Sequence, residues 1–250
     1  MSFMYNPFPF DDPKPVNRPE LSEKTVSSIV GGGTPNVAKK FAAPIIEKAR
    51  KKNQVVAFDG YTTVDWTVFL NLLARECAAA GIEFESVDAN AECFKSGKEI
   101  DAMIDPMLIW DKKIDPTLLY GKIYKGGYEG MLDEEKTQAF EKKVSALGEG
   151  TGKVVAVFGY GVLIPRFRAL YDTKCFFDIT PKTSILRIRR GEYVNIGKKR
   201  PDIINRVIRR CYYCDFEMAV CSRRELLRNN VPDFWFLSDD PQNIQMLPYE

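Results

Sequence analysis

Short apolar runs recur along this chain, with helical patterns between most of them, and this alternation constrains the fold more than any other feature. The clearest run is 154–158 (VVAVF), which stands between two glycines. Four further segments have the apolar content or the alternation of strands: 55–58, 83–87, 175–179 and 234–237. Such strands are typical of a parallel sheet that helices cover on both faces. We therefore predict an α/β fold with a doubly wound, mainly parallel sheet of about five strands.

The first fifty residues differ from the rest of the chain. Five of the fifteen prolines lie within the first twenty residues, which predicts an extended arm because proline fixes φ and lacks a backbone donor. Helical patterns follow at 21–30, which ends in three glycines, and at 35–51. We assign residues 1–50 to the arm and these N-terminal helices, and residues 51–250 to the α/β domain.

Residues 96–133 interrupt the alternation of strands and helices. The part 96–110 favours a helix that is broken near Pro106, because proline lacks the backbone donor that a continuous helix needs. The part 111–133 is rich in glycine, tyrosine and lysine and has no clear period. We expect it to leave the core as a long excursion.

The composition excludes several kinds of chemistry. The chain contains no histidine, so it cannot by itself form a Ser-His-Asp or Cys-His nucleophile or a histidine-ligated metal centre. Its six cysteines have no framework spacing, and we expect reduced thiols and no metal site. The 36 basic and 34 acidic side chains give a net charge of only +2, which indicates neither a nucleic-acid nor a membrane partner.

The hydropathy pattern predicts a cytoplasmic location. No apolar run reaches the roughly 18 residues that a membrane-spanning helix needs. The N-terminus lacks the basic start and apolar stretch of a secretory signal. We therefore expect neither a membrane span nor export.

The turn after the strand at 55–58 has the frame of a phosphate-binding loop but not its residues. Residues 60–67 read GYTTVDWT, where the pattern G-x-x-x-x-G-K-[ST] would hold nucleotide phosphates. Asp65 replaces the second glycine and Trp66 replaces the lysine, whereas Thr67 keeps the metal-binding hydroxyl. A carboxylate a few ångströms from a triphosphate costs about 1–4 kcal/mol at surface-like dielectric. We therefore predict a degenerate phosphate loop with weakened nucleotide affinity.

Two interpretations of this turn remain open. In the first, Asp65 only begins the next helix, where its charge suits the helix dipole, and Trp66 belongs to the core. In the second, the helix N-terminus binds a smaller anion through backbone donors and the hydroxyls of Thr62, Thr63 and Thr67.

Acidic residues also end the first two predicted strands, at the edge where doubly wound sheets bind ligands. Asp59 and Gly60 end the first strand and open the turn. Asp88 ends the second strand, where its carboxylate is placed to accept a proton from a substrate hydroxyl. A solvated turn aspartate is the alternative interpretation of Asp88.

The strongest local charge lies at 187–210, which holds nine basic and two acidic residues. The segment therefore has a net charge of +7, which leaves the remaining chain with a net charge of +2 − 7 = −5. Arg187, Arg189 and Arg190 are candidates for anion binding, because a guanidinium matches the geometry of a phosphate. Nucleic-acid binding through 187–210 is an alternative that the small net charge does not favour.

Four segments of the chain, taken in order, resemble the strand-and-lid plan of uridine kinases: 55–66 (VVAFDGYTTVDW), 86–94 (SVDANAECF), 176–191 (FFDITPKTSILRIRRG) and 234–243 (FWFLSDDPQN). They are more closely similar to the amino-terminal half of long bacterial proteins known as class I mannose-6-phosphate isomerases. In those proteins a kinase-like domain precedes a cupin isomerase domain. The resemblance covers about residues 50–245 and includes the early DDPKPVNRP stretch.

The resemblance implies a P-loop-kinase-type fold and a role for some of the residues. It places Asp88 as the phosphoacceptor base and Arg187, Arg189 and Arg190 in the lid. It also implies a cupin-type isomerase domain as partner, and a second copy of the chain is the alternative partner. The isomerase activity itself would belong to the cupin domain, because the metal-binding histidines of a cupin are absent from these 250 residues.

We therefore expect a kinase-like domain in hexose (mannose) metabolism whose altered turn argues against catalysis. It would bind a phosphorylated sugar or a nucleotide-like anion, or dock to the sugar-phosphate isomerase domain. The first alternative is an active sugar or nucleoside phosphotransferase, with Asp88 as base, Thr67 on Mg²⁺ and the arginine lid replacing the lysine. Mg²⁺ and ATP are expected cofactors only in this alternative. The second alternative is a nucleic-acid-binding module that binds through the basic segment 187–210.

Overall fold

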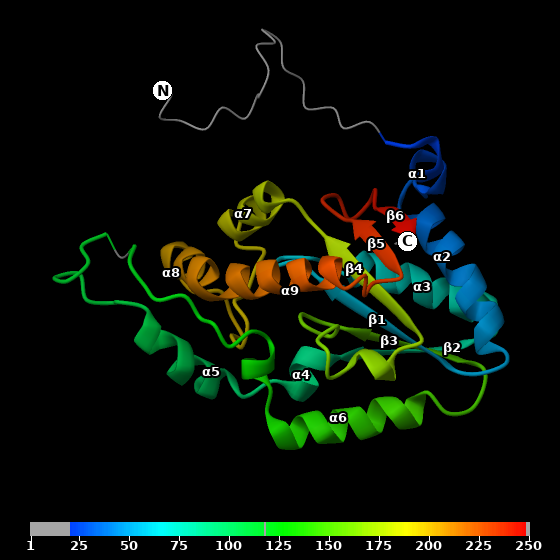
Figure 1. The fold of residues 1–250 in the computed structure, drawn as a ribbon, viewed down its shortest axis with the longest axis horizontal. Coiled ribbons are helices and arrows are strands. Elements are labelled where there is room, and N and C mark those ends of the chain that lie inside the picture. Colours follow the sequence, from blue (N-terminus) through cyan, green and yellow to red (C-terminus); the bar gives the residue numbers. More distant parts are fainter. Residues whose placement is uncertain (1–20, 118, 249–250) are drawn as a thin grey trace, which may run out of the picture.

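A mostly parallel sheet of six strands lies at the centre of the computed structural model, which describes residues 21–117 and 119–248 (Figure 1). The strand order is β2-β3-β1-β4-β5-β6, and only β6 runs antiparallel to its neighbour. The strands are β1 (Gln54–Gly60), β2 (Glu83–Asp88), β3 (Lys153–Phe158), β4 (Thr173–Asp178), β5 (Phe234–Leu237) and β6 (Gln245–Pro248). The predicted α/β class and all five predicted strands are confirmed, and the sheet has one strand more than expected.

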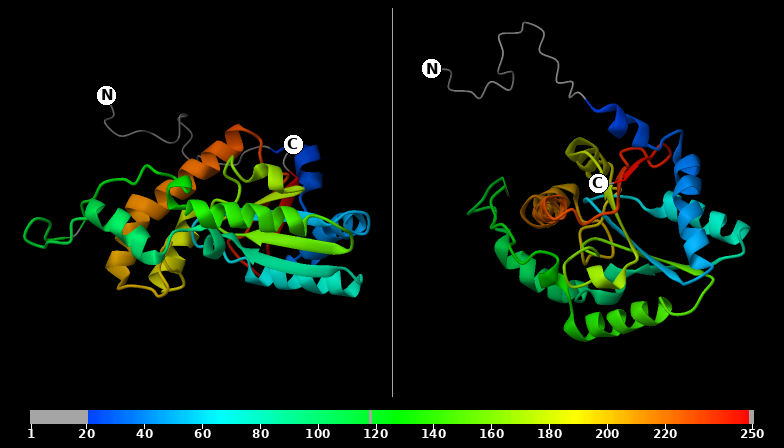
Figure 2. Two further views of the ribbon diagram at one scale, coloured as in Figure 1. Left: turned by 90° about the horizontal axis from the view of Figure 1, so that it is seen from below. Right: turned by 45° about the vertical axis from the view of Figure 1, so that its right-hand side comes forward.

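Helices cover both faces of the sheet (Figure 2). On one face lie α2 and α3, and on the other lie α6 and α9. The helices are α1 (Glu23–Ser28), α2 (Thr34–Ala49), α3 (Thr67–Ala79), α4 (Ala89–Cys93), α5 (Gly97–Ile104), α6 (Glu134–Leu147), α7 (Pro181–Arg189), α8 (Ile204–Arg210) and α9 (Phe216–Arg228). A π-helical turn, Cys211–Asp215, joins α8 to α9.

An aromatic cluster forms the core between the sheet and α2 and α3. Phe69 of α3 lies at its centre, with ring centroids 5.6 Å from Phe41 of α2 and 5.9 Å from Phe58 of β1. Phe177 of β4 and Phe236 of β5 stack on each other at 4.4 Å. All five side chains are almost fully buried. Burial of this kind stabilises each aromatic side chain by about 2–3 kcal/mol relative to exposure.

The boundaries of the N-terminal region follow from capping and proline positions. The helix expected at 21–30 is α1, whose N-cap Ser22 accepts a hydrogen bond from the Thr25 N–H. Phe41 places α2 on the same core as the strands. The predicted arm, residues 1–20, lies outside the described residues, and the division at residue 50 stays a prediction.

The expected excursion leaves the core between α5 and α6 and extends beyond the end of the sheet (Figures 1 and 2). It doubles back on itself through a bridge between Leu108 and Gly121. The Tyr124 N–H then bonds to the Tyr213 carbonyl at 2.8 Å, which attaches the excursion to the π-helical turn. No helix in the described ranges is both long and apolar enough to cross a membrane.

Candidate functional site

The strand-to-helix turn expected at 60–67 is present, and its own side chains fill its interior. β1 ends at Gly60 and α3 begins at Thr67. A Cβ added to Gly60 would lie 2.8 Å from Val64 Cγ1 and 3.0 Å from Trp66 Cζ2. The isopropyl and indole groups therefore pack directly over the end of the strand. A phosphate-binding loop instead leaves room there, so that its backbone N–H groups can point at the phosphates.

Trp66 is held in this place by aromatic contacts. Its ring lies 5.2 Å from Tyr160 and 5.9 Å from Phe158, centroid to centroid. Its indole Nε1 is buried and has no hydrogen-bond partner among the described residues. The indole thus belongs to the packing of the turn, as the first interpretation of the sequence proposed.

The three threonines of the turn point to different partners. The Thr62 hydroxyl is buried and donates to the Asp215 carbonyl at 3.2 Å. Thr63 has a positive φ of 75°, and its N–H donates to the Tyr160 hydroxyl at 3.1 Å. The N–H of Thr67 donates to the Asp65 carboxylate at 2.9 Å, so this carboxylate already occupies a donor at the start of α3. Thr63 and Thr67 face a common cleft, whereas Thr62 does not.

The three arginines expected to bind anions are also separated. The Arg187 guanidinium is buried and donates to three backbone carbonyls, at 2.8 Å, 3.3 Å and 2.9 Å: those of Thr63, Ser238 and Asp239. Arg190 pairs with Glu192 at 2.5 Å and 3.0 Å. Arg189 is exposed and faces neither of the two clefts described next.

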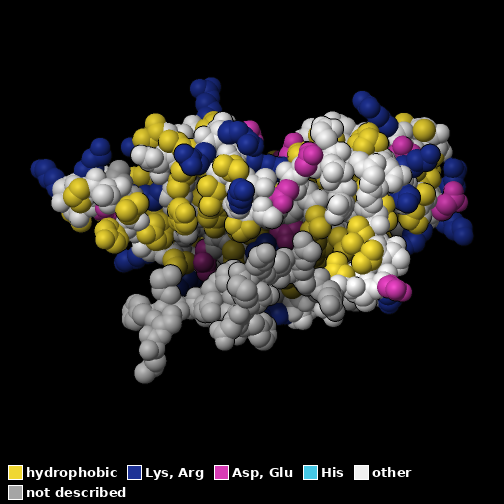
Figure 3. Space-filling model, turned by 90° about the horizontal axis from the view of Figure 1, so that it is seen from above, with side chains coloured by type: hydrophobic (Ala, Val, Ile, Leu, Met, Phe, Trp, Pro, Cys, Tyr) yellow, Lys and Arg dark blue, Asp and Glu magenta, His cyan; other side chains and the backbone are white. Residues whose placement is uncertain are grey.

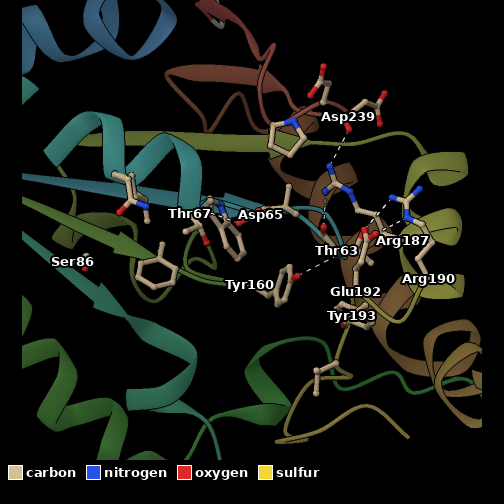
Figure 4. A pocket seen from close by; sticks show the side chains of 18 residues that line it. Thr63, Asp65, Thr67, Ser86, Tyr160, Arg187, Arg190, Glu192, Tyr193 and Asp239 are labelled. Carbon is tan, nitrogen blue, oxygen red and sulfur yellow. Dashed lines mark hydrogen bonds and ion pairs between the residues drawn. The ribbon is translucent and has the colours of Figure 1, made fainter. Parts of the chain in front are cut away.

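The first cleft, here called the acidic cleft, has a volume of about 840 Å³ and lies between the turn, α7 and the β5–β6 connection (Figure 4). Its aromatic lining includes Trp66, Phe158, Tyr160 and Tyr193. Its charged lining consists of four carboxylates and two guanidinium groups, from Asp65, Glu192, Asp239, Asp240, Arg187 and Arg190. The formal charge of the lining is therefore 2 − 4 = −2.

The second cleft, here called the lysine cleft, has a volume of about 480 Å³. Asp88 is its one lining carboxylate, and its four lining cations are Lys95, Lys136, Lys198 and Lys199. The formal charge of the lining is 4 − 1 = +3. Asp88 also caps α4, because its Oδ1 accepts the Ala91 N–H at 3.0 Å. The structure thus places Asp88 in a different cleft from Thr67 and Arg187.

The four lysines differ in how firmly they are held. Lys95 Nζ donates to the Gly130 carbonyl at 2.8 Å, and Lys136 Nζ donates to the Phe94 carbonyl at 3.1 Å. Lys198 pairs with Asp101 at 2.5 Å. Lys199 is exposed, and among the described residues it contacts no carboxylate. Because carbonyls do not neutralise an ammonium group, three of the four lysines keep their charge uncompensated.

Tyr160 lies between the two clefts and lines both. Asn90 holds its backbone, accepting the Tyr160 N–H at 2.7 Å and donating to the Tyr160 carbonyl at 2.8 Å. Burial raises the pKa of the phenol well above its usual value. The hydroxyl therefore stays neutral and fixes the turn at Thr63.

Asp59, the acidic residue near the end of β1, is part of the core. Its carboxylate is fully buried and accepts the N–H groups of Gly60, Gly161 and Leu163 at 2.7 Å, 3.0 Å and 2.9 Å. Burial raises the pKa of Asp59 from 3.8 to about 6, against the opposing effect of these three donors. One carboxylate thus joins the end of β1 to the segment that carries Tyr160.

Sequence reasoning missed Tyr160 and the lysines. The run Gly159-Tyr160-Gly161 after the clearest strand was a signal for Tyr160, since both glycines have positive φ. No local pattern marked the lysines, because they come from separate segments of the chain. Among the described residues, no three cysteine, aspartate or glutamate side chains lie close enough to hold a metal ion.

The fold is similar to that of kinases. A crystal structure of a fructose transport system kinase candidate from Silicibacter sp. TM1040 superposes with a TM-score of 0.50 at 15% identity, covering 75% of this chain and 94% of that chain. A uridine kinase candidate from Bacillus stearothermophilus superposes with a lower TM-score of 0.46 at 10% identity, covering 79% of this chain and 96% of that chain. Phosphoribulokinase from Rhodobacter spheroides superposes with a TM-score of 0.41 at 13% identity, covering 75% of this chain and 70% of that chain. The first of these superpositions confirms the kinase-like fold that the resemblance to uridine kinases implied.

The chain belongs to a family described as a domain of unknown function, DUF8485, whose model matches residues 38–250. No curated protein matches the chain. The expected link to a mannose-6-phosphate isomerase stays a prediction.

Proposed function

We propose that this chain is a kinase-fold domain that binds a small phosphorylated molecule and does not transfer phosphoryl groups. The observation that carries the proposal is the β1–α3 turn, whose interior the side chains of Val64 and Trp66 occupy. A sugar phosphate of hexose metabolism is the ligand class that the sequence resemblance suggests. Docking to a cupin-type isomerase domain, or to a second copy, belongs to the same proposal.

The charges of the acidic cleft support the absence of phosphoryl transfer. Catalysis of this reaction depends on positioned cations that neutralise the charge on the phosphates. Arg187 is already bonded to three carbonyls and Arg190 to Glu192. The remaining lining carboxylates, among them Asp65 and Asp239, would repel a triphosphate.

The lysine cleft supports an anionic ligand. Its +3 lining attracts a phosphate group, and lysine binds phosphate as a point charge with rotatable donors. Asp88 lies in the same cleft with only one carboxylate oxygen engaged by α4. A sugar phosphate carries both groups that this pair would bind, a phosphate for the lysines and a hydroxyl for Asp88.

A thermal-shift screen tests the proposal, because a ligand that binds only the folded state raises the melting temperature. We expect hexose phosphates to raise it and Mg-ATP to leave it unchanged. The shift should shrink in the Lys136→Ala/Lys199→Ala variant and persist unchanged in Lys39→Ala, which removes an exposed lysine outside the cleft. If no hexose phosphate or inorganic phosphate shifts the wild type, the ligand class is wrong.

The active phosphotransferase makes the opposite prediction. It requires Mg-ATP to bind. The affinity for Mg-ATP should then fall in Thr67→Ala, because the Thr67 hydroxyl would ligate the metal ion.

Nucleic-acid binding through 187–210 requires an affinity that falls steeply as salt is added, because binding releases counterions. Most basic side chains of that segment already have partners, including Arg209 with Asp115 and Arg210 with Asp101.

A further inference from the structure

The excursion and α8 form an exposed apolar groove at one end of the molecule. The groove has a volume of about 420 Å³, and Leu119, Ile123, Ile208, Tyr212 and Tyr213 supply its apolar lining. None of the residues that line it lines the acidic cleft or the lysine cleft. The groove is therefore a third surface, independent of the proposed ligand site.

Exposed hydrophobic side chains are concentrated in the two chain segments that form this groove. Of the fourteen large hydrophobic side chains that are exposed in the described residues, eight lie within 109–123 and 203–212. Leu119 is 66% exposed and Tyr212 is 58% exposed. Figure 3 shows many hydrophobic side chains at the left end of the molecule, with lysine and arginine side chains among them. Contiguous apolar surface of this kind marks an interaction site.

The walls of the groove are fixed to each other. The Arg209 guanidinium stacks on the Trp110 ring at 4.7 Å, lies 3.6 Å from Asp115, and donates to the Tyr120 carbonyl. The Tyr213 hydroxyl donates to the Leu119 carbonyl at 2.5 Å. Polar interactions therefore hold the excursion against α8, although the apolar side chains above them are exposed. A preformed groove binds with a smaller entropy cost.

The charge of the rim selects the partner. The excursion segment 109–125 carries four exposed lysines, and none of them pairs with a carboxylate among the described residues: Lys112, Lys113, Lys122 and Lys125. Its two carboxylates are Asp115, which is buried beside Arg209, and Asp111. Lys122 and Lys125 lie within two positions of Ile123, which lines the groove, so a partner in the groove would meet positive charge beside it.

We propose that this groove docks an amphipathic helix of a partner protein, with its apolar side in the groove and acidic residues on its flanks. The concave shape fits the ridge of a helix, which is a common mode of peptide recognition. A second copy of the chain would bring the same positive rim and repel the first. A flat bilayer does not require a groove.

Fluorescence anisotropy with a labelled synthetic peptide tests the proposal. The probe is an amphipathic helix of about 18 residues, with leucines at i, i+3, i+4 and i+7 and glutamates on the flanks. Its control carries lysines in place of the glutamates. We expect the full chain to bind the glutamate peptide at least tenfold more tightly than the lysine peptide.

Variants locate the binding. Ile123→Asp and Tyr212→Asp should each lower the affinity for the glutamate peptide at least tenfold. Val26→Asp, at a side chain that is 55% exposed on α1, should leave this affinity unchanged. Lys122→Glu/Lys125→Glu should reverse the preference between the two peptides. These side chains are exposed, so the melting temperature should not change.

Four outcomes would overturn the proposal. In the first, neither peptide binds, or Val26→Asp weakens binding as much as Ile123→Asp. In the second, anionic vesicles bind the chain through the groove and the peptide does not. In the third, sedimentation shows a dimer that Tyr212→Asp dissociates. In the fourth, the peptide binds only after residues 1–20 are removed, which would make that segment the occupant.

Discussion

Two clefts lie side by side at the same edge of the sheet and have opposite charge. The acidic cleft lies where a kinase fold would hold nucleotide phosphates, yet its lining carries −2. The lysine cleft, on the other side of Tyr160, carries +3. The difference teaches that two clefts at the same edge of one sheet can carry opposite formal charge, because separate segments of the chain supply their linings.

The two clefts also use their cations differently. In the acidic cleft, the Arg187 guanidinium is held by the protein itself, because it donates to three backbone carbonyls. The lysine cleft keeps three ammonium groups without a paired carboxylate, and among the described residues Lys95 and Lys136 donate only to backbone carbonyls. Removing Arg187 from the acidic cleft should therefore lower the free energy of unfolding. Removing a lysine from the lysine cleft should instead lower the affinity for the proposed phosphorylated ligand.

The largest expected effect is that of Arg187→Ala on stability. The change leaves the carbonyls of Thr63, Ser238 and Asp239 without this donor, and it should lower the free energy of unfolding by about 3 kcal/mol. Urea denaturation measures the change, and Arg189→Ala on the exposed side of α7 is the control, expected within about 0.5 kcal/mol. Unchanged stability in Arg187→Ala would mean that the guanidinium serves a ligand.

The second effect is the pH dependence that Asp59 contributes. Its pKa is raised from 3.8 to about 6 in the folded state, so the folded chain holds this proton more tightly than the unfolded chain does. The stabilisation is present below about pH 4 and is lost as pH rises through 6, by about 3 kcal/mol at most.

Urea denaturation at pH 4.5 and 7.5 tests this with Asp59→Asn, which cannot titrate. The free energy of unfolding of the wild type relative to Asp59→Asn should fall between the two pH values. A difference that stays constant, or that grows with pH, would show that the carboxylate is not destabilised by its burial.

The third effect concerns the affinity for a hexose phosphate in the lysine cleft. Each of Lys136→Ala and Lys199→Ala should reduce it about threefold, and the two together about tenfold, because both cations are exposed and screened by water. Calorimetric titration at two salt concentrations measures the change. Equal losses in Lys39→Ala would indicate a nonspecific effect of net charge.

The smallest effect separates the two groups of the ligand. Asp88→Asn removes a negative charge from the lysine cleft, so it should raise the affinity for inorganic phosphate about twofold. The same variant should lower the affinity for a hexose phosphate, which loses the carboxylate acceptor of its hydroxyl. If the two affinities change in the same direction, Asp88 does not bind a hydroxyl of the ligand.

Much of the fold could be predicted because its signals are local. Apolar runs predicted five strands, and the capping residue Ser22 precedes α1. The three glycines do not end α1 as expected, because α1 ends at Ser28 and Gly33 is instead the N-cap of α2. The sequence did not show β6, since QMLP is only four residues long and lies at an edge where half of its side chains are exposed. Its position depends on pairing with β5, which no local pattern encodes.

The site was less predictable, for a physical reason. The altered turn was visible in the spacing of Asp65 and Trp66, but the inward packing of the indole depends on Tyr160, almost a hundred positions further along the chain. The partners of Arg187 likewise come from two distant loops. A local excess of arginine indicates charge, and only the fold shows whether that charge is already engaged.

The central claim is that the β1–α3 turn has no room for nucleotide phosphates, and calorimetric titration of the wild-type chain with Mg-ATP tests it most directly. We predict no saturable heat at millimolar nucleotide. Saturable binding that Thr67→Ala abolishes would contradict the account, because it would require Val64 and Trp66 to leave the turn and triphosphate to take their place.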